Sequence, residues 1–245
     1  MEIPRDNPSR QWPVPDEPWI LKQAWNDLLF AHWPVARDRL RELVPPFVDL
    51  DLFDGEAWLT LTPFRLSDLR PRGIPALPWI SAFDEINVRT YVTRGGKPGI
   101  YFFSLDANST LAVSGATSVF HLPYFLADIR VAADRGRLSY TSRRRSAPAA
   151  EFEAHYAPAG APFEPTPGTI DYFLTERYCL YTQDAASRAY RVEIQHAPWQ
   201  LQPAEAEIAT NTMAAAAGIR LPSMAPLLHF AKRQDVLTWR PHGLD

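Results

Sequence analysis

Alternation of apolar and polar residues predicts a chain built mostly of short β-strands. The pattern indicates strands at residues 23–33, 56–66, 83–94, 99–107, 109–114, 137–143, 149–156, 178–182, 188–196 and 230–239. The strongest signal is the pair 83–94 and 99–107, which flanks the turn sequence GGKPG and therefore predicts a β-hairpin. The second strand of this pair is apolar on both faces, so we expect it at the centre of a sheet that is covered on both sides.

Helical spacing is confined to three short segments. Residues 34–45 carry an apolar stripe, and Pro34 is expected in the first turn of that helix. Residues 168–177 predict a short helix with Thr169 as its N-cap. The alanine-rich segment 203–218 predicts a helix that ends at Gly218. The expected fold class is therefore mainly β (α+β), an antiparallel sheet with two or three peripheral helices.

Proline refines this picture, because it is disfavoured inside helices and central strands. The chain has 24 prolines in 245 residues, and five of them lie in residues 1–20. We expect these residues to form an extended arm, anchored by Trp12 and Trp19. The Pro-rich loop 70–79 is too short and too apolar to separate two domains. Residues 21–245 are therefore predicted to form a single domain.

Charge and cysteine content narrow the function classes. The net charge of −3 gives no overall attraction to nucleic acid or to an anionic membrane, and no apolar run approaches the length of a membrane span. No signal peptide is recognisable at the N-terminus. The lone Cys179 rules out an internal disulfide, is expected to be a buried thiol, and favours a reducing, cytoplasmic location. The run Arg143–Arg145 indicates a solvated strand end.

The strand at residues 85–93 carries the most interesting polar pattern. Its odd positions place an acid, an amide, a guanidinium and a phenol on one face: Glu85, Asn87, Arg89 and Tyr91. The opposite face is largely apolar. If the polar face points inward, it could orient a small carboxylate or carbonyl ligand, because arginine binds carboxylates through two parallel hydrogen bonds. The pattern alone favours the alternative, in which this face meets solvent.

Other candidate residues are fewer. Glu176 and Arg177 are adjacent charges between apolar runs, and we expect a structural ion pair between them. His196 could act as a general acid or base, although its position before Ala-Pro-Trp is more typical of a structural hydrogen bonder. The six histidines are scattered without metal-ligand spacing, so no metal site is expected. No nucleotide-binding motif is present, and no cofactor is predicted.

Six blocks spread over most of the chain resemble the signature blocks of the YqjF-like family of uncharacterised bacterial proteins. They are LLFAHWPV (28–35), NVRTYV (87–92), GIYFFSLDA (99–107), HLPYFLA (121–127), FLTERYCLY (173–181) and HAPWQL (196–201). This family is in turn remotely similar to the acetoacetate decarboxylase-like superfamily. The resemblance implies a curved, cone-like antiparallel barrel around an internal cavity.

The resemblance also implies a site, and this sequence departs from it. In the decarboxylases a cavity lysine, in a segment of the form R-E-x-x-G-x-P-K-K, forms a Schiff base with a β-keto acid. Glu85, in the sequence FDE, matches the glutamate of an earlier strand in that family. Pro123 matches the proline of the lysine segment, but Tyr124 and Phe125 stand where the lysines should be. The remaining lysines, Lys22, Lys97 and Lys232, are not expected to replace the missing amine.

Three hypotheses remain open at this point. The leading one is a protein that binds a small carbonyl- or carboxylate-bearing molecule in its cavity, with a lining of Glu85, Asn87, Arg89, Tyr91 and Tyr124. The second is an enzyme without a Schiff base, in which Glu85 or His196 acts as the general base on a small keto acid. The third is a structural protein without a ligand, whose aromatic residues form an interface in a homo-oligomer.

Overall fold

The computed structural model describes residues 3, 7–77 and 81–244 and confirms a mainly β architecture. Within these residues there are thirteen strands and four short helices. The strands are β1 (Leu21–Val35), β2 (Asp49–Leu50), β3 (Ala57–Pro71), β4 (Phe83–Arg94), β5 (Lys97–Ala107), β6 (Tyr124–Asp134), β7 (Arg137–Arg144), β8 (Glu151–Pro158), β9 (Cys179–Gln183), β10 (Ala189–Gln195), β11 (Leu201–Asn211), β12 (Leu227–Thr238) and β13 (His242–Leu244). The helices are α1 (Arg37–Leu43), α2 (Thr110–Phe120), α3 (Ile170–Thr175) and α4 (Met213–Ala216). No helix in this part of the chain is long and apolar enough to cross a membrane.

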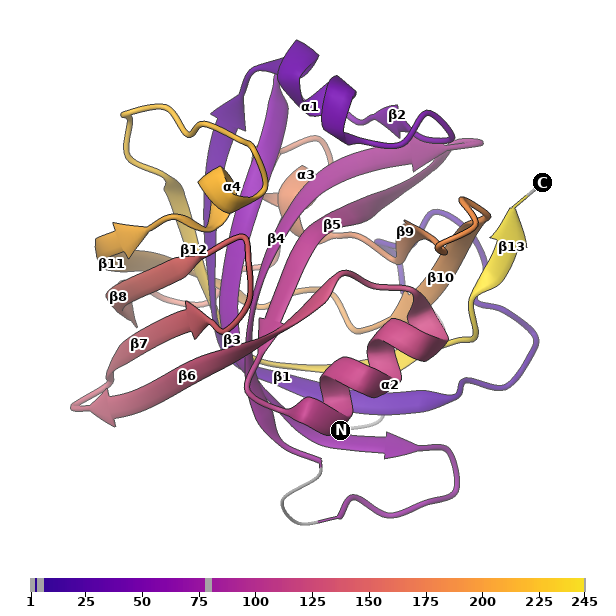
Figure 1. Ribbon diagram of the computed structural model, residues 1–245, viewed down its shortest axis with the longest axis horizontal. Coiled ribbons are helices and arrows are strands. Elements are labelled where there is room, and N and C mark those ends of the chain that lie inside the picture. Colours follow the sequence, from indigo (N-terminus) through magenta and orange to yellow (C-terminus); the bar gives the residue numbers. More distant parts are fainter. Residues whose placement is uncertain (1–2, 4–6, 78–80, 245) are drawn as a thin grey trace.

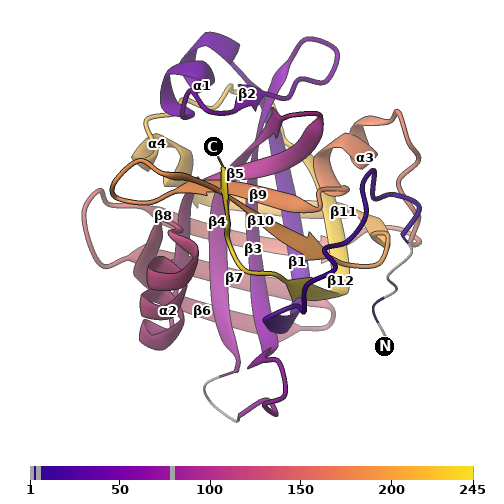
Figure 2. The same ribbon diagram turned by 90° about the vertical axis from the view of Figure 1, so that its right-hand side faces the viewer.

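Five strands, in the order β12-β1-β3-β4-β5, form a curved wall that belongs to two closed rings. On one side, β6, β7, β8 and β11 connect β5 back to β12 and complete a nine-strand barrel. On the other side, β9 and β10 connect the same two strands and complete a smaller ring. Figure 1 shows these two groups on opposite sides of the wall, and in Figure 2 β9 and β10 cross over its long strands.

Alternation along the wall divides its side chains between the two interiors. On β4, Ile86 and Val88 join the main apolar core inside the nine-strand barrel. Glu85, Asn87 and Arg89 point into the smaller ring, yet they too are buried, with 3–7% of their surface exposed. The prediction from the pattern alone, that this polar face meets solvent, is therefore wrong. β9 and β10 cover the face that an open antiparallel sheet would leave in water.

Most predicted elements are confirmed. The β4–β5 hairpin forms as expected, with β5 central between β4, β6 and β9. The Oγ of Thr169 caps α3 by accepting a hydrogen bond from the amide of Tyr172. The predicted helix at 34–45 is shorter, because Pro34 lies in β1 rather than in the first helical turn. Strand β6, which carries Tyr124, was not predicted.

Two predictions were wrong about the type of element. The predicted strand at 109–114 is the start of α2, where the Oγ of Ser109 accepts a hydrogen bond from the amide of Ala112. The predicted helix at 203–218 is mostly strand β11, followed by the single turn of α4. Along β11, Ala204, Ala206 and Ile208 pack on the core while the intervening glutamates are exposed, and pairing with β8 outweighs the helical propensity of alanine and glutamate.

The N-terminal arm is held by its polar contacts as well as by tryptophan. Arg10 and the indole Nε1 of Trp12 both donate hydrogen bonds to the carboxylate of Glu193 on β10. The guanidinium of Arg72 lies 5.6 Å from the ring of Trp19. Residues 1–2 and 4–6 of the expected arm, and 78–79 of the expected loop 70–79, lie outside the described residues.

The prediction for Cys179 is confirmed, and the prediction for the run Arg143–Arg145 is wrong for its middle residue. Cys179 is buried, as expected. Arg144 is buried too, against the prediction of a solvated strand end, because it makes a two-pronged ion pair with Asp106 through contacts of 2.7 Å from Nε and Nη2. Its neighbours Arg143 and Arg145 are exposed. This buried pair joins β7 to β5 where the two rings diverge.

We expect Arg144→Met to lower the free energy of unfolding by roughly 3–5 kcal/mol, because Asp106 would remain buried without a counter-charge. Urea denaturation at pH 7 measures the loss. The matched control is Arg145→Met, which removes an exposed ion pair with Asp128 and should leave the denaturation midpoint nearly unchanged. Equal effects of the two substitutions would contradict the assigned role of the buried pair.

Candidate functional site

The smaller ring encloses a cavity of about 340 Å³. Its walls come from β1, β3, β4, β5, β9, β10 and β12, with α2 along one side. Most of the lining is apolar: Ile20, Leu21, Trp25, Leu28, Phe30, Phe64, Leu66, Leu69, Phe83, Ile100, Phe102, Leu105, Leu111, Ala112, Ala116, Val119, Phe120, Leu122, Leu180, Val192, Ile194 and Trp199. A concave, mainly apolar site with a few convergent polar groups is the usual form of a small-molecule site.

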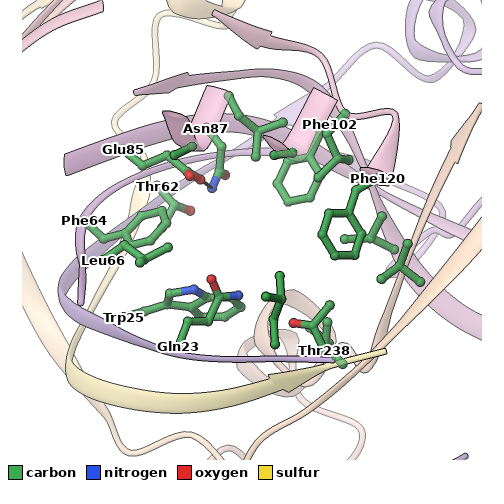
Figure 3. Close-up of a pocket in the computed structure, with 18 of the residues that line it drawn as sticks. Gln23, Trp25, Thr62, Phe64, Leu66, Glu85, Asn87, Phe102, Phe120 and Thr238 are labelled. Carbon is green, nitrogen blue, oxygen red and sulfur yellow. Dashed lines mark hydrogen bonds between the residues drawn. The ribbon is translucent and has the colours of Figure 1, made fainter. Parts of the chain in front are cut away.

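Several polar side chains lie together on the β3–β4 wall. Figure 3 shows Glu85, Asn87 and Thr62 side by side across the cavity from the ring of Phe120. The phenol of Tyr124, from β6, donates a hydrogen bond of 2.7 Å to the Oε2 of Glu85. The Nδ2 of Asn87 donates a longer bond of 3.4 Å to Oε1. The expected convergence of the β4 polar face with the phenol after Pro123 is therefore present.

Burial changes the acidity of this pair. Removal from water raises the pKa of Glu85 from 4.5 to about 7, although the hydrogen bonds from Tyr124 and Asn87 oppose the shift. Burial and the neighbouring carboxyl raise the pKa of Tyr124 well above its usual value, so the phenol keeps its proton. Glu85 is thus balanced between its acid and carboxylate forms near neutral pH.

Arg89 differs from the other buried arginines of the described chain. Arg10, Arg144 and Arg177 each pair with a carboxylate, from Glu193, Asp106 and Asp51 respectively. Arg89 is 7% exposed, and no carboxylate among the described residues pairs with it. Its guanidinium lies 5.3 Å from the ring of Phe30, and burial lowers its pKa.

Several buried polar atoms of the lining have no hydrogen-bond partner within the described protein. They are the Oγ1 of Thr62, the Oδ1 of Asn87, the Nε of Arg89, the Nε1 of Trp199 and the Oγ1 of Thr238. Buried polar atoms are normally satisfied, and leaving one unpaired costs about 1–3 kcal/mol. Five such atoms belong to residues that line this one cavity.

Tyr91 shares the face of Glu85 and Arg89 but does not line the cavity. Its hydroxyl donates to the backbone oxygen of Leu174 on α3 and lies 2.5 Å from the Oγ1 of Thr60. The ring of Phe173 packs 5.1 Å away. Helix α3 thus covers Tyr91 at this end of the ring. The expectation that Tyr91 forms part of the cavity lining is therefore wrong.

A hydrogen-bonded chain behind Arg89 was missed in the sequence. Asp171 contacts His229 at 2.9 Å, His229 contacts His32 at 3.2 Å, and His32 contacts Thr60 at 2.8 Å. Burial lowers the pKa of both histidines, so both are neutral at pH 7. The members are far apart in sequence, and no local spacing could reveal them. The chain fixes Tyr91, which packs beside Arg89.

His196 lies in the cavity wall, but its ring is engaged by the backbone. Its Nδ1 is 2.8 Å from the oxygen of Ala197, and its Nε2 is 3.2 Å from the oxygen of Arg177. Burial lowers its pKa. The neutral ring can donate to only one of these oxygens, but both nitrogens face backbone oxygens, and this geometry supports the structural interpretation.

The expected pair between Glu176 and Arg177 does not form. Glu176 accepts hydrogen bonds from the phenol of Tyr178 and from the backbone amide of Trp199. Arg177 pairs with Asp51. Adjacent residues here point in different directions, as strand-like backbone requires. Arg177 lines the cavity. A charged residue directly before a buried strand was therefore a sequence signal of the site, although the prediction gave Arg177 only a structural role.

No lysine of the described chain lines the cavity. The ammonium of Lys97 lies 5.6 Å from the ring of Trp12, and that of Lys232 pairs with Asp27. Lys22 points away from the two cavity residues that flank it in β1, Leu21 and Gln23. Among the residues placed by the structure, no group of three or more potential metal ligands is found either.

Comparison with known proteins identifies relatives over nearly the whole chain. The DUF2071 family, described as an uncharacterized conserved protein, matches residues 22–235. The uncharacterized protein YqjF of Bacillus subtilis (strain 168) is 53% identical over 226 residues, which cover 92% of this chain and 93% of that protein. The resemblance inferred from the sequence blocks is therefore confirmed.

Solved structures place the fold among the acetoacetate decarboxylase-like proteins. Acetoacetate decarboxylase from Legionella pneumophila has a TM-score of 0.64 at 13% identity, with coverage of 97% of this chain and 92% of that one. The enduracididine biosynthesis enzyme MppR, complexed with pyruvate, scores 0.63 at 11% identity, with coverage of 97% and 95%. An acetoacetate decarboxylase-like enzyme from Sphingomonas wittichii RW1 scores 0.62 at 13% identity, with coverage of 96% and 98%. At these identities the likeness extends to the fold alone.

The raised pKa of Glu85 predicts a specific dependence of stability on pH. Between pH 4.5 and about 7 the unfolded chain has lost this proton while the folded chain retains it, so the contribution of Glu85 to stability falls as pH rises through this window. Glu85→Gln removes the ionisation. We expect the variant to gain stability relative to the wild type between pH 4 and pH 8, by on the order of 2–3 kcal/mol.

Urea denaturation across this pH range measures the difference. Glu205→Gln, at an exposed position on β11, is the control and should follow the wild type at every pH. A wild-type curve parallel to that of Glu85→Gln would show that the carboxyl titrates normally.

Proposed function

We propose that this chain, which belongs to the DUF2071 family, binds a small molecule bearing a carboxylate or carbonyl group in the cavity of the smaller ring. The observation that carries the proposal is Arg89, a buried guanidinium at the cavity wall without a carboxylate partner in the described chain. A ligand carboxylate would supply the counter-charge that Glu193, Asp106 and Asp51 supply to the other three buried arginines.

The neighbouring groups suit such a ligand. Arginine presents parallel donors that match the two oxygens of a carboxylate, and a charge-assisted bond is about twice as strong as a neutral one. Thr62, Thr238 and Trp199 also line the cavity, and each carries a hydrogen-bond donor without a partner among the described residues. Glu85, in its protonated form, can donate to a carbonyl oxygen.

The comparisons lend support at the level of the fold. One structural neighbour, MppR, is complexed with pyruvate, a molecule that carries both a carboxylate and a carbonyl. A filled interior would have favoured the third hypothesis, and the cavity of about 340 Å³ counts against it. Glu85, Asn87, Arg89 and Tyr124 are the proposed ligand-binding residues.

The wider setting follows from composition. The net charge of −3 and the lone buried cysteine agree with a cytoplasmic protein that binds neither nucleic acid nor membranes. Residues 1–20 act in this proposal as an arm on a single domain of residues 21–245. The formation of a homo-oligomer stays a prediction, which rests on the aromatic content of the chain.

Binding of small keto acids and simple carboxylates tests the proposal. Calorimetry at pH 7 should detect at least one binder in a panel of 2-oxo and 3-oxo acids. Arg89→Met should weaken that binding on the order of 100-fold, because the ligand carboxylate would be buried without a counter-charge. Arg89→Lys keeps the charge but loses the planar fork, so an intermediate loss is expected.

Arg137→Met is the matched control, since Arg137 is exposed and pairs only with the exposed Glu207. Its binding should equal that of the wild type. Wild-type affinity in Arg89→Met, or no binding by any acid in the panel, would refute the proposal.

Proton transfer is a second candidate function, and it is favoured by the pKa of Glu85 near 7. A general base is most effective when its pKa lies close to the working pH. Of the two proposed bases, Glu85 is the better placed, because both ring nitrogens of His196 face backbone oxygens. The reaction would be removal of a proton from the carbon next to a ligand carbonyl.

Exchange of that proton for deuterium, followed by NMR, tests the second function. Glu85→Gln should abolish exchange and spare binding, and the wild-type rate should rise with pH through the ionisation near 7. Borohydride reduction with acetoacetate should leave the protein mass unchanged, because the described residues place no lysine in the cavity lining. Exchange that persists in Glu85→Gln would exclude this role for the residue, and a reduced adduct would reveal a recruited lysine.

A further inference from the structure

We infer that the preferred ligand is an amphipathic monocarboxylate, with its acid group at Arg89 and a medium-length alkyl or aryl tail that extends toward α2. This inference rests on the proposed function and adds the substrate class. It follows from three features of the cavity: the mostly apolar lining around one polar cluster, the volume, and the composition of the rim.

One polar cluster lies in a lining that is otherwise mostly apolar. Glu85, Asn87 and Thr62 lie together on the β3–β4 wall, and Figure 3 shows the ring of Phe120 on the far side of the cavity from them. A ligand that is polar throughout would place polar groups against the apolar part of the lining. A ligand with an acid at one end and an apolar tail matches both parts.

The volume exceeds what a very small acid needs. About 340 Å³ corresponds to the share of roughly eleven water molecules in the liquid, at about 30 Å³ each. It falls at the lower end of the range for drug-sized ligands. A three-carbon acid held at Arg89 would leave most of the apolar wall uncovered, and burial of that wall is where additional affinity is available.

The rim of the cavity is apolar as well. Three lining residues are exposed to solvent, and all of them lie on α2 with helical i, i+4 spacing: Leu111, Gly115 and Val119. The neighbouring stripe of the same helix, Ala112 and Ala116, faces the cavity from less exposed positions. Helix α2 has no charged residue. An apolar tail can therefore lie along α2 toward the opening without burying a charge.

The second arginine of the lining argues for one carboxylate rather than two. Arg177 reaches the cavity, but its guanidinium pairs with Asp51 and lies 4.3 Å from the ring of Phe173. Its charge is already balanced. A dicarboxylate would bring a second negative charge into the cavity, where the described residues offer one unbalanced cation, Arg89.

A chain-length series tests the inference. Dissociation constants are measured by calorimetry for 2-oxo acids of three, five, six and eight carbons and for phenylpyruvate. Affinity should rise roughly fourfold for each added methylene until the tail reaches the rim. A dicarboxylate of the six-carbon length should bind more weakly than its monocarboxylate counterpart.

A variant of α2 locates the tail. Ala116→Phe places a ring inside the cavity and should remove the gain from length, with the binding of pyruvate retained as a check that the protein is folded. Ser114→Phe adds the same ring to the exposed side of α2, outside the lining, and should follow the wild type.

The outcomes separate this inference from the proposed function. Equal affinity for pyruvate and the eight-carbon acid, or an unaltered series in Ala116→Phe, would overturn the inference and leave carboxylate binding at Arg89 intact. Absence of binding for every acid would overturn both. A length-dependent gain that disappears in Ala116→Phe would support the assigned tail position.

Discussion

Desolvation of the β4 polar face is the constraint from which the character of the site follows. The strand belongs to a wall with an interior on each side, so alternation cannot send half of its side chains to water. Ile86 and Val88 enter the main core, while Glu85, Asn87 and Arg89 enter the cavity. A carboxyl removed from water shifts toward its neutral form, and a guanidinium removed from water requires a counter-charge. The raised pKa of Glu85 and the need of Arg89 for a counter-charge therefore both result from the way β9 and β10 close the smaller ring.

The same chain shows how it handles buried arginines elsewhere. Arg144 and Asp106 form a two-pronged pair at the point where β7 meets β5, and Arg10 and Glu193 hold the arm against β10. Each of these cations is neutralised within the fold. Arg89 is supported instead by aromatic faces and by the chain that runs from Asp171 to Tyr91. Its surroundings fix its position and leave its charge available to the cavity.

Sequence periodicity identified the side chains of β4 but not their environment. Whether Glu85 and Arg89 meet water depends on β9 and β10, which are nearly a hundred residues away, and no local pattern contains that information. Tyr91 shows the converse, because the correct face was predicted and α3 then excluded it from the cavity. Composition misled at 203–211, where alanine and glutamate favour a helix, but pairing with β8 stabilises a strand. The resemblance supplied what periodicity lacked, a closed barrel with an interior cavity.

Tyr124 bears on the chemistry that the cavity can support, because the resemblance to the acetoacetate decarboxylases implies a lysine at this position. An amine at this position could form a covalent adduct with a carbonyl. The phenol instead keeps its proton and donates a hydrogen bond to Glu85. That hydrogen bond stabilises the carboxylate and opposes part of the effect of burial, which brings the pKa of Glu85 to about 7 instead of higher. Tyr124 thus offers no nucleophilic amine and instead adjusts a neighbouring acid. Among the described residues Arg89 has no carboxylate partner, and an acid such as Glu85 beside it agrees with the proposal of a ligand that stays non-covalently bound.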